Sequence, residues 1–441
     1  MEGLPVIAID FGASSIRVCR IDLEARPVAI RVIHRHPHGP IRYSDGSLRW
    51  DWARLVAEMH RGLELALREG PVASIGVDTW GVDYGLLDQR GDLVAAPFCY
   101  RDERTRDWTE IVARIGARRL YELAGLQLMP LNTIFQLAAH DAGERGRARS
   151  LLMLPELIVY ELCGVPLAEA TSAGTTGLVD IQTGRWSEEL LDAIEADPDW
   201  FHEIRKAGTV AGSWRGIPVH LVGGHDTASA VVAMAAHPSP GTAFVSAGTW
   251  FLVGRELTAP DPGESAQAAN FSNERGTFGS IRFLKNLIGM WLLEECRRGW
   301  GNPSVESLLD AAAAVRTAVP VIDVNQPELL APADMAVTLR EMAGLPSDVE
   351  RGVIVKLILD SIADGVARIV DDLDPVDDIT IFGGASRSAL LCDTLAGRSG
   401  RAVRTGPAEA TALGNALTQG IALGAFADQE EARASLAPRS R

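Results

Sequence analysis

Residues 222–230 read Val-Gly-Gly-His-Asp-Thr-Ala-Ser-Ala, and the prediction of the fold begins with them. The apolar run Val219–Val222 predicts a strand, and the Ala- and Val-rich run Ala228–Ala236 predicts a buried helix. Two glycines lie at the turn between them, where unusual backbone angles or close approach of a ligand are expected. Asp226 then lies at the N-terminal end of the predicted helix. Asp is also an ordinary helix N-cap, so these residues alone fit a cap as well as a catalytic carboxylate.

A related pattern opens the chain. The apolar run 6–10 ends at Asp10, small residues follow at 12–15, and a second apolar run starts at Ile16. This predicts a β-hairpin. Small residues let a phosphate approach the backbone N–H groups, and a carboxylate at a strand end can hold Mg²⁺ through water. A solvent-facing hairpin turn would have similar residues.

Residues 242–254 repeat the order of strand, small-residue turn and strand. The repetition predicts two domains of related architecture, each with a phosphate-gripping hairpin, facing each other across a cleft.

A third segment contains residue types that commonly bind sugars. Trp80, Gly81 and Asp83 lie between two predicted strands within residues 74–88. An aromatic ring offers an apolar face to a sugar, and polar groups bind its hydroxyls. A β-turn beside a core Trp is the alternative on local evidence.

The remaining pattern alternates helices and strands. Residues 379–388 predict a strand, a glycine turn and a helix start, a common but weak signal of a nucleotide site. Gly414 is expected to allow close packing. Helices are predicted at 52–69, 151–162, 188–194, 283–295, 304–315, 351–370 and 407–423, and short strands at 178–180 and 402–404.

Length and composition limit the function. A chain of 441 residues with 47% apolar residues is large enough for two domains with proper cores. Its net charge of −16 argues against nucleic acid or anionic membrane as a partner. We find no signal peptide and no apolar stretch of membrane-spanning length. The five scattered cysteines indicate reduced thiols in a cytoplasmic protein.

Domain boundaries follow from these patterns. The linker is expected at His237–Gly241, which contains two prolines. The first domain is predicted over residues 1–237 and the second over 242–425. A polar, loosely held tail is predicted over 426–441. A monomer and a homodimer both fit the sequence.

Taken together, these motifs resemble the FGGY family of carbohydrate kinases over roughly residues 4–423. The resemblance rests on residues 10–17, 224–227, 246–250 and 382–384, in that order. Within the family, residues 78–83, 225–231, 284–286 and 406–415 are most similar to the bacterial kinases that phosphorylate L-rhamnulose. The resemblance implies an α/β fold with two ribonuclease H-like, actin-like domains around an ATP–sugar cleft. It also implies transfer of the γ-phosphoryl group of ATP to O1 of the ketose L-rhamnulose.

The resemblance also assigns roles to single residues. Asp226 would be the catalytic base that accepts the proton of the attacking hydroxyl, and Asp10 would hold Mg²⁺ through water. Phosphate and nucleotide contacts are expected at Gly12, Ala13, Ser14, Ser15, Ile16, Arg17, Gly248, Thr249, Glu294, Gly383, Gly384 and Ala385. Sugar contacts are expected at Trp80, Gly81, Asp83, His225, Asp226, Thr227 and Asn286.

Several residues depart from the family pattern. Ala385 stands where a third glycine is usual, Glu294 replaces Gln, and Ala247 replaces a serine. Residues 386–388 and Ile16 also differ. Most of these departures lie on the nucleotide side, so they bear on nucleotide affinity and preference more than on sugar chemistry.

Two alternatives stay open at this point. The first is a kinase of the same fold acting on another ketose, such as L-fuculose or a xylulose. The second is an actin-like ATP-binding switch that phosphorylates no sugar. Asp226 argues against the switch, because a pure nucleotide switch needs no base facing a sugar.

Overall fold

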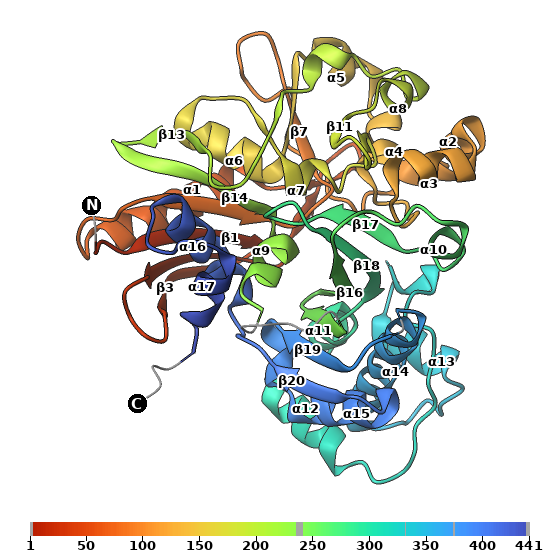
Figure 1. Cartoon of the computed structure of the whole chain (residues 1–441). Helices are drawn as coiled ribbons and strands as arrows, with labels where there is room; N and C mark the ends of the chain where they lie inside the picture. The colour runs from red at the N-terminus through yellow and green to blue at the C-terminus, as the bar shows by residue number, and fades with distance from the viewer. Residues whose placement is uncertain (1–2, 235–240, 331, 374, 438–441) are drawn as a thin grey trace. The chain divides into compact units, whose positions relative to one another are not determined.

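The computed structural model describes residues 3–234, 241–330, 332–373 and 375–437 (Figure 1). The chain divides into two compact units, and each is described by itself. The first unit comprises residues 1–237, 256–283 and 410–441, and the second comprises 238–255 and 284–409. Segments 256–283 and 410–425, which the sequence placed in the second domain, are therefore grouped with the first unit. Most of the predicted linker, residues 237–240, lies outside the described residues.

A mixed six-stranded sheet forms the centre of the first unit, in the order β13-β14-β6-β1-β2-β3. Its strands are β1 (Val6–Gly12), β2 (Ser15–Asp22), β3 (Ala29–Pro37), β6 (Ile75–Thr79), β13 (Val210–Trp214) and β14 (Ile217–His225). β1 and β2 form the predicted antiparallel hairpin, whereas β1, β6 and β14 run parallel. Because β1 is buried on both faces up to Phe11, its sequence is almost continuously apolar.

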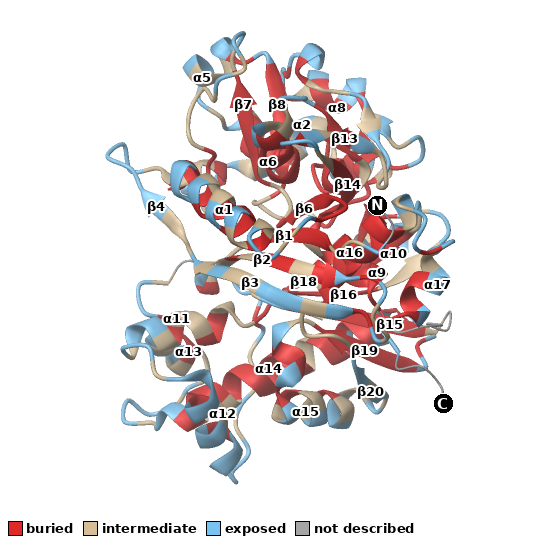
Figure 2. Ribbon diagram, turned by 90° about the vertical axis from the view of Figure 1, so that its left-hand side faces the viewer, coloured by how far each residue is buried: buried red, intermediate tan, exposed pale blue. Residues whose placement is uncertain are grey.

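Helices and smaller strands complete the first unit. These are α1 (Trp52–Leu67), α2 (Trp108–Ile115), α3 (Ala117–Ala124), α4 (Thr133–Ala138), α5 (Ala142–Arg147), α6 (Leu154–Cys163), α7 (Ala170–Ala173), α8 (Glu188–Ala193), α9 (Asp226–Val232), α10 (Glu264–Ala268), α16 (Ala410–Ala422) and α17 (Gln429–Ala434), with β4 (Pro40–Arg42), β5 (Leu48–Trp50), β7 (Tyr84–Leu87), β8 (Ser150–Met153), β9 (Ala168–Glu169), β10 (Val179–Asp180), β11 (Arg185–Trp186), β12 (Ile204–Arg205) and β17 (Ser272–Arg275). Figure 2 shows the resulting pattern: β1 and β6 are buried, whereas α1 presents an exposed face and a buried one.

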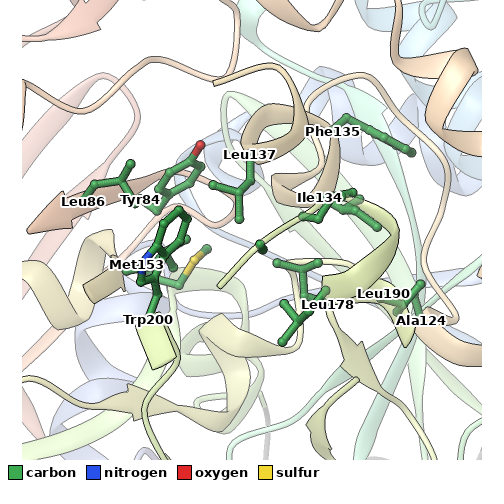
Figure 3. Close-up of a cluster of buried hydrophobic side chains, with 14 of the residues drawn as sticks. Tyr84, Leu86, Ala124, Ile134, Phe135, Leu137, Met153, Leu178, Leu190 and Trp200 are labelled. Carbon is green, nitrogen blue, oxygen red and sulfur yellow. The ribbon is translucent and has the colours of Figure 1, made fainter. Parts of the chain in front are cut away.

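A hydrophobic cluster holds together the segment inserted between β6 and β13 (Figure 3). Tyr84 and Leu86 of β7, Phe135 of α4, Met153 of β8 and Trp200 are among its buried members. This cluster gives the insertion a core of its own beside the central sheet.

The second unit is built on the C-terminal hairpin. Its elements are β15 (Thr242–Ala247), β16 (Trp250–Leu257), β18 (Ile281–Ile288), β19 (Asp378–Phe382), β20 (Ala402–Thr405), α11 (Trp291–Gly299), α12 (Val305–Ala314), α13 (Met335–Met342), α14 (Arg351–Asp372) and α15 (Ala389–Ser399), and the ends of β16 and β18 belong to the first unit. Its strands belong to a six-stranded sheet in the order β17-β18-β16-β15-β19-β20, of which β17 is grouped with the first unit.

The predicted repetition is confirmed by topology. In one sheet the hairpin β1–β2 is followed by β6, parallel to β1, and by β14, parallel to β6. In the other, the hairpin β15–β16 is followed by β19, parallel to β15, and by β20, parallel to β19. Both sheets therefore use the same order of one hairpin and two parallel strands.

Three predicted elements differ from the structure. Residues 283–288, expected to start a helix, belong to strand β18, and the helix α11 begins only at Trp291. Residues 151–153 form β8 before helix α6 begins. A short apolar run fits a buried strand and a buried helix equally well, so its sheet neighbours decide. The tail is less loose than expected, since Phe426 and Ala432 are buried.

No helix in the described part of the chain is long and apolar enough to cross a membrane. Three of the five cysteines are buried, and none of the five forms a disulfide.

Gly414 lies where α16 packs against α9. A Cβ at this position would stand 1.7 Å from the carbonyl oxygen of Ser229 in α9. We expect Gly414→Ala to force the two helices apart and to lower the free energy of unfolding by about 1–3 kcal/mol. The measurement is the urea midpoint followed by circular dichroism.

Gly397→Ala is the matched control, because a Cβ at this exposed helical glycine would meet nothing within 4 Å. We expect it to leave stability unchanged or to raise it by about 0.5–1 kcal/mol. Equal midpoints for the Gly414 variant and the wild type would contradict the close packing.

Candidate functional site

The carboxyl ends of the parallel strands β1, β6 and β14 gather acidic residues at one edge of the first sheet. Asp10 of β1 and Asp78 of β6 are register partners, and both are fully buried. Asp226 follows the last residue of β14 and begins helix α9. Parallel alignment therefore brings together two residues that were predicted as functional, Asp10 and Asp226, and a third, Asp78, that was quoted in a motif without a role.

Asp10 has a cationic partner on the same hairpin. Arg17 Nη2 lies 2.8 Å from Asp10 Oδ2, so a predicted phosphate ligand and the predicted metal residue contact each other. The hairpin tip between them is anchored by His38, whose Nε2 donates to the carbonyl oxygen of Gly12 at 2.9 Å. Burial lowers the pKa of His38 to about 4, so the ring is neutral at physiological pH.

Asp78 is held in a buried polar chain. Asn415 of α16 donates to Asp78 Oδ2 at 2.6 Å, and Gln419 donates to Asn415 Oδ1 at 2.7 Å. Ser74 donates in turn to Gln419. Burial first, and then the charge of Asp10, raise the pKa of Asp78 well above its ordinary value. The protonated form of the Asp78 carboxyl is thereby favoured, which limits its repulsion with Asp10.

Asp226 differs from these two carboxyls in its exposure. Its side chain is 28% exposed. The N-cap of α9 is His225 rather than Asp226, and among the described residues the Asp226 carboxylate accepts only from Thr227 Oγ1, at 3.2 Å. The helix-cap alternative is thus not what the structure shows, and the carboxylate keeps acceptor capacity for another group.

His225 is surrounded by charged groups. Its Nε2 lies 3.4 Å from Asp226 Oδ1. On the other side of the ring, Arg282 Nη2 lies 3.0 Å from Nδ1 and Glu274 Oε2 lies 3.3 Å from it. Burial raises the pKa of Glu274, but the charge of Arg282 acts in the opposite direction, and the pKa stays below its usual value.

Buried carboxyl groups also hold the backbone of the Gly-Gly-His-Asp turn. Glu169 Oε2 accepts from the Gly224 N–H at 3.1 Å and from Thr171 Oγ1 at 2.6 Å. Thr171 Oγ1 accepts in turn from the His225 N–H at 3.0 Å. Burial, with Glu169 nearby, raises the pKa of the adjacent Glu156 to about 8.

The predicted sugar segment lies next to this turn. A Cβ on Gly81 would come within 3.3 Å of the His225 ring, so the structure brings these two predicted residues together. Asp83 is fully buried and accepts from the indole N–H groups of Trp50 and Trp80 at 2.7 and 2.9 Å. Burial raises the Asp83 pKa to about 6. The Asp83 carboxylate thus orients the two indoles, and Gln136 donates to its other oxygen at 3.2 Å.

The predicted phosphate and nucleotide residues outside the first hairpin lie in the second unit: Gly248, Thr249, Glu294, Gly383, Gly384 and Ala385. The start of α11 is hydrogen-bonded to the tip of the β15–β16 hairpin. The backbone N–H groups of Met290 and Trp291 donate to the carbonyl oxygens of Gly248 and Thr249, respectively. Glu294 on α11 forms a bidentate pair with Arg297 at 2.8 and 2.9 Å. Arg297 therefore compensates the charge of Glu294.

The glycine turn after β19 shows why its first residue is glycine. Gly383 has φ of +90°, and a Cβ there would stand 2.9 Å from the carbonyl oxygen of Ala247. A Cβ on Gly384 would meet nothing within 4 Å, whereas Ala385 is buried. The open side of this turn is thus at Gly384. Asn286, a predicted sugar residue, lies on β18 in the part assigned to the second unit.

Sequence reasoning missed several residues of the site. Arg282, Glu274, Glu169 and His38 contact predicted residues but received no role. Arg282 left one signal, a charged residue inside the apolar run before Asn286. The others lie in segments with no distinctive pattern, and their partners are distant in the chain.

Two curated relatives and one solved structure are similar to this chain over most of its length. Rhamnulokinase of Klebsiella pneumoniae subsp. pneumoniae is 35% identical over 97% of this chain and 91% of its own length. Rhamnulokinase of Bacteroides thetaiotaomicron is 36% identical over 96% of this chain and 91% of its own length. The crystal structure of xylulose kinase from Lactobacillus acidophilus superposes with a TM-score of 0.78, covering 97% of this chain and 91% of that chain. At 15% identity this last likeness shows a shared fold.

Models of one protein family match almost the whole chain. The N-terminal domain of the FGGY family of carbohydrate kinases matches residues 5–233, and the C-terminal domain of the same family matches residues 243–423. Together with the two relatives, these matches identify the chain as a member of the FGGY family of carbohydrate kinases.

Proposed function

We propose that this chain transfers the γ-phosphoryl group of ATP to O1 of L-rhamnulose, with Asp226 as the base. The observation that carries the proposal is the partly exposed carboxylate of Asp226, next to His225 and Thr227 at the end of β14. The choice of sugar is supported by the two rhamnulokinases at 35% and 36% identity.

The environments of the three carboxyls support different roles. Burial and the charge of Asp10 raise the pKa of Asp78 and so favour its protonated form, which cannot accept the sugar's proton. Asp10 is fully buried and paired with Arg17. Asp226 alone among these three is 28% exposed and so can meet a substrate hydroxyl. A general base must reach the proton that it removes.

In the proposed reaction, O1 of the sugar attacks the γ-phosphorus of ATP while its proton passes to Asp226, and the bond from that phosphorus to the bridging oxygen breaks so that ADP leaves. His225, Thr227 and Gly81 would bind the sugar, with His225 fixed by Arg282 and by the backbone contacts of Glu169 and Thr171. Trp80 and Asp83 would act beside them, since Asp83 orients the indole ring of Trp80. The contribution of these contacts is to hold the hydroxyl in line for attack.

The first hairpin, β1–β2, would bind the phosphate groups of ATP. Backbone N–H groups of residues 12–16 and the guanidinium of Arg17 would contact the phosphate oxygens. Asp10 would hold Mg²⁺ through water, and Mg²⁺ bound to ATP neutralises charge that develops on the transferring group. The site fits a divalent cation, because Asp78 Oδ1 is buried with no hydrogen-bond partner among the described residues and Asp10 lies beside it.

The second unit would bind the nucleotide. Gly248 and Thr249 on its hairpin tip would contact phosphate, and the open turn at Gly383, Gly384 and Ala385 would receive adenosine. Glu294 is expected to act together with Arg297, so its charge repels the nucleotide less than an unpaired carboxylate would. A reaction that uses ATP and a small ketose would take place in the cytoplasm, with no nucleic acid or membrane as a partner.

The role of Asp226 is tested by Asp226→Asn, which keeps the shape and removes the base. We expect kcat to fall by about 10²- to 10⁴-fold. Binding of ATP and sugar, measured by calorimetry, is expected to persist. The control is Asp199→Asn, an exposed acidic residue in another first helical turn. A kcat within tenfold of the wild type would exclude Asp226 as the base.

The sugar is tested by release of ADP with Mg²⁺-ATP and a panel of L-rhamnulose, L-fuculose, L-xylulose, D-xylulose and glycerol. We expect the highest kcat/KM with L-rhamnulose. Turnover on another ketose only would keep the kinase mechanism and replace the substrate. Bound ATP with no sugar-dependent turnover would instead support the nucleotide switch.

The role of Asp10 is tested by Asp10→Asn. A carboxylate that binds a metal through water contributes about 10- to 100-fold to metal affinity. We therefore expect the concentration of Mg²⁺ at half-maximal rate to rise by about that factor. A Mg²⁺ dependence identical to that of the wild type would show that Asp10 does not hold the cation.

A further inference from the structure

Arg282 is a buried cation directly beside His225. Its side chain is 0% exposed, and Nη2 lies 3.0 Å from Glu274 Oε2 and 3.0 Å from His225 Nδ1. Burial lowers the pKa of Arg282, while Glu274 and Asp226 act in the opposite direction. Arginine stays charged in proteins and has only donor groups. Its N–H toward His225 therefore requires an acceptor.

This requirement limits the protonation of the ring. A neutral imidazole carries one proton, and the nitrogen without it is the acceptor. If Nδ1 accepts from Arg282, the proton is on Nε2. That nitrogen lies 3.4 Å from Asp226 Oδ1, so its N–H faces the carboxylate of the proposed base.

The other two protonation states fit less well. A proton on Nδ1 could be donated to Glu274 Oε2 at 3.3 Å, but it would also face the N–H of Arg282 at 3.0 Å. It would leave the lone pair of Nε2 facing the Asp226 carboxylate. A doubly protonated ring would place a second cation against the buried guanidinium.

We propose that Arg282 is a positioning residue that keeps His225 neutral with its proton on Nε2, directed toward Asp226. Held this way, His225 orients the base and cannot itself take the proton of the sugar. Glu274 acts on Arg282 as its counter-ion. The effect on catalysis rests on the proposed kinase function, whereas the position of the proton does not.

The proton is located by ¹⁵N–¹H correlation spectra of the full-length protein labelled with ¹⁵N-histidine. The signals of His225 are identified by their loss in His225→Gln. We expect a protonated Nε2 and an unprotonated Nδ1 at pH 7. A proton on Nδ1, or on both nitrogens, would overturn the proposal.

Two variants separate Arg282 from Glu274 as the cause. In Arg282→Met we expect the proton to move in part to Nδ1, because the donor is gone and Glu274 can accept. In Glu274→Gln, which keeps Arg282, we expect the proton to stay on Nε2. If the Nε2 proton is lost in Glu274→Gln but not in Arg282→Met, then Glu274 determines the position of the His225 proton, and the proposal is refuted. Arg282→Met removes a buried charge and can prevent folding. If Arg282→Met does not fold, the spectrum of Glu274→Gln still tests the proposal.

A double-mutant cycle tests the consequence for catalysis. The amide N–H of a glutamine at position 225 replaces the Nε2–H and has no tautomers. Arg282→Lys is expected to lower kcat/KM more in the wild type than in His225→Gln, with a coupling in the range of about 2- to 150-fold. Equal losses in both backgrounds would contradict a role through His225. If no ketose is phosphorylated, the spectra still decide where the proton lies.

Discussion

The parallel alignment of β1, β6 and β14 is the constraint on which the site depends. Because parallel strands end at one edge, Asp10, Asp78 and the turn before Asp226 come together there. Fully buried carboxyls are unfavourable unless they are neutralised or paired. The protein meets this constraint in two ways: Arg17 pairs with Asp10, and Asn415 donates a hydrogen bond to Asp78, whose pKa is raised by burial. Asp226 remains partly exposed, which leaves one carboxylate for chemistry.

The turn that carries Asp226 is fixed from several sides. Glu169 holds the Gly224 N–H, Thr171 holds the His225 N–H, and Arg282 contacts the His225 ring. Helix α16 packs on α9 through Gly414, where a side chain would not fit. A site held by hydrogen bonds from separate elements loses little freedom when a substrate binds, which favours catalysis through positioning.

Much of the fold could be predicted from local patterns, and the errors have a common cause. The two hairpins, the long helix α14 and the turn after β14 each have strong periodicity or glycine signals, and the structure confirms them. The prediction of a helix at residues 283–288 is wrong because a short, mainly apolar segment is compatible with a buried strand and with a buried helix. Neighbouring strands of the sheet decided for β18, and no local pattern contains that information.

The sequence by itself determined the family, the order of the motifs and the residue types that the chemistry needs, because these depend on short stretches such as residues 222–230. Only the tertiary structure decided which partners surround them. Arg282 lies 57 positions from His225, and Asn415 lies 337 positions from Asp78. The surroundings of Asp10, Asp78 and Asp226 differ in burial and charge, although the three carboxyls are chemically identical. Those surroundings arise from segments that are distant in the chain and meet only when it folds.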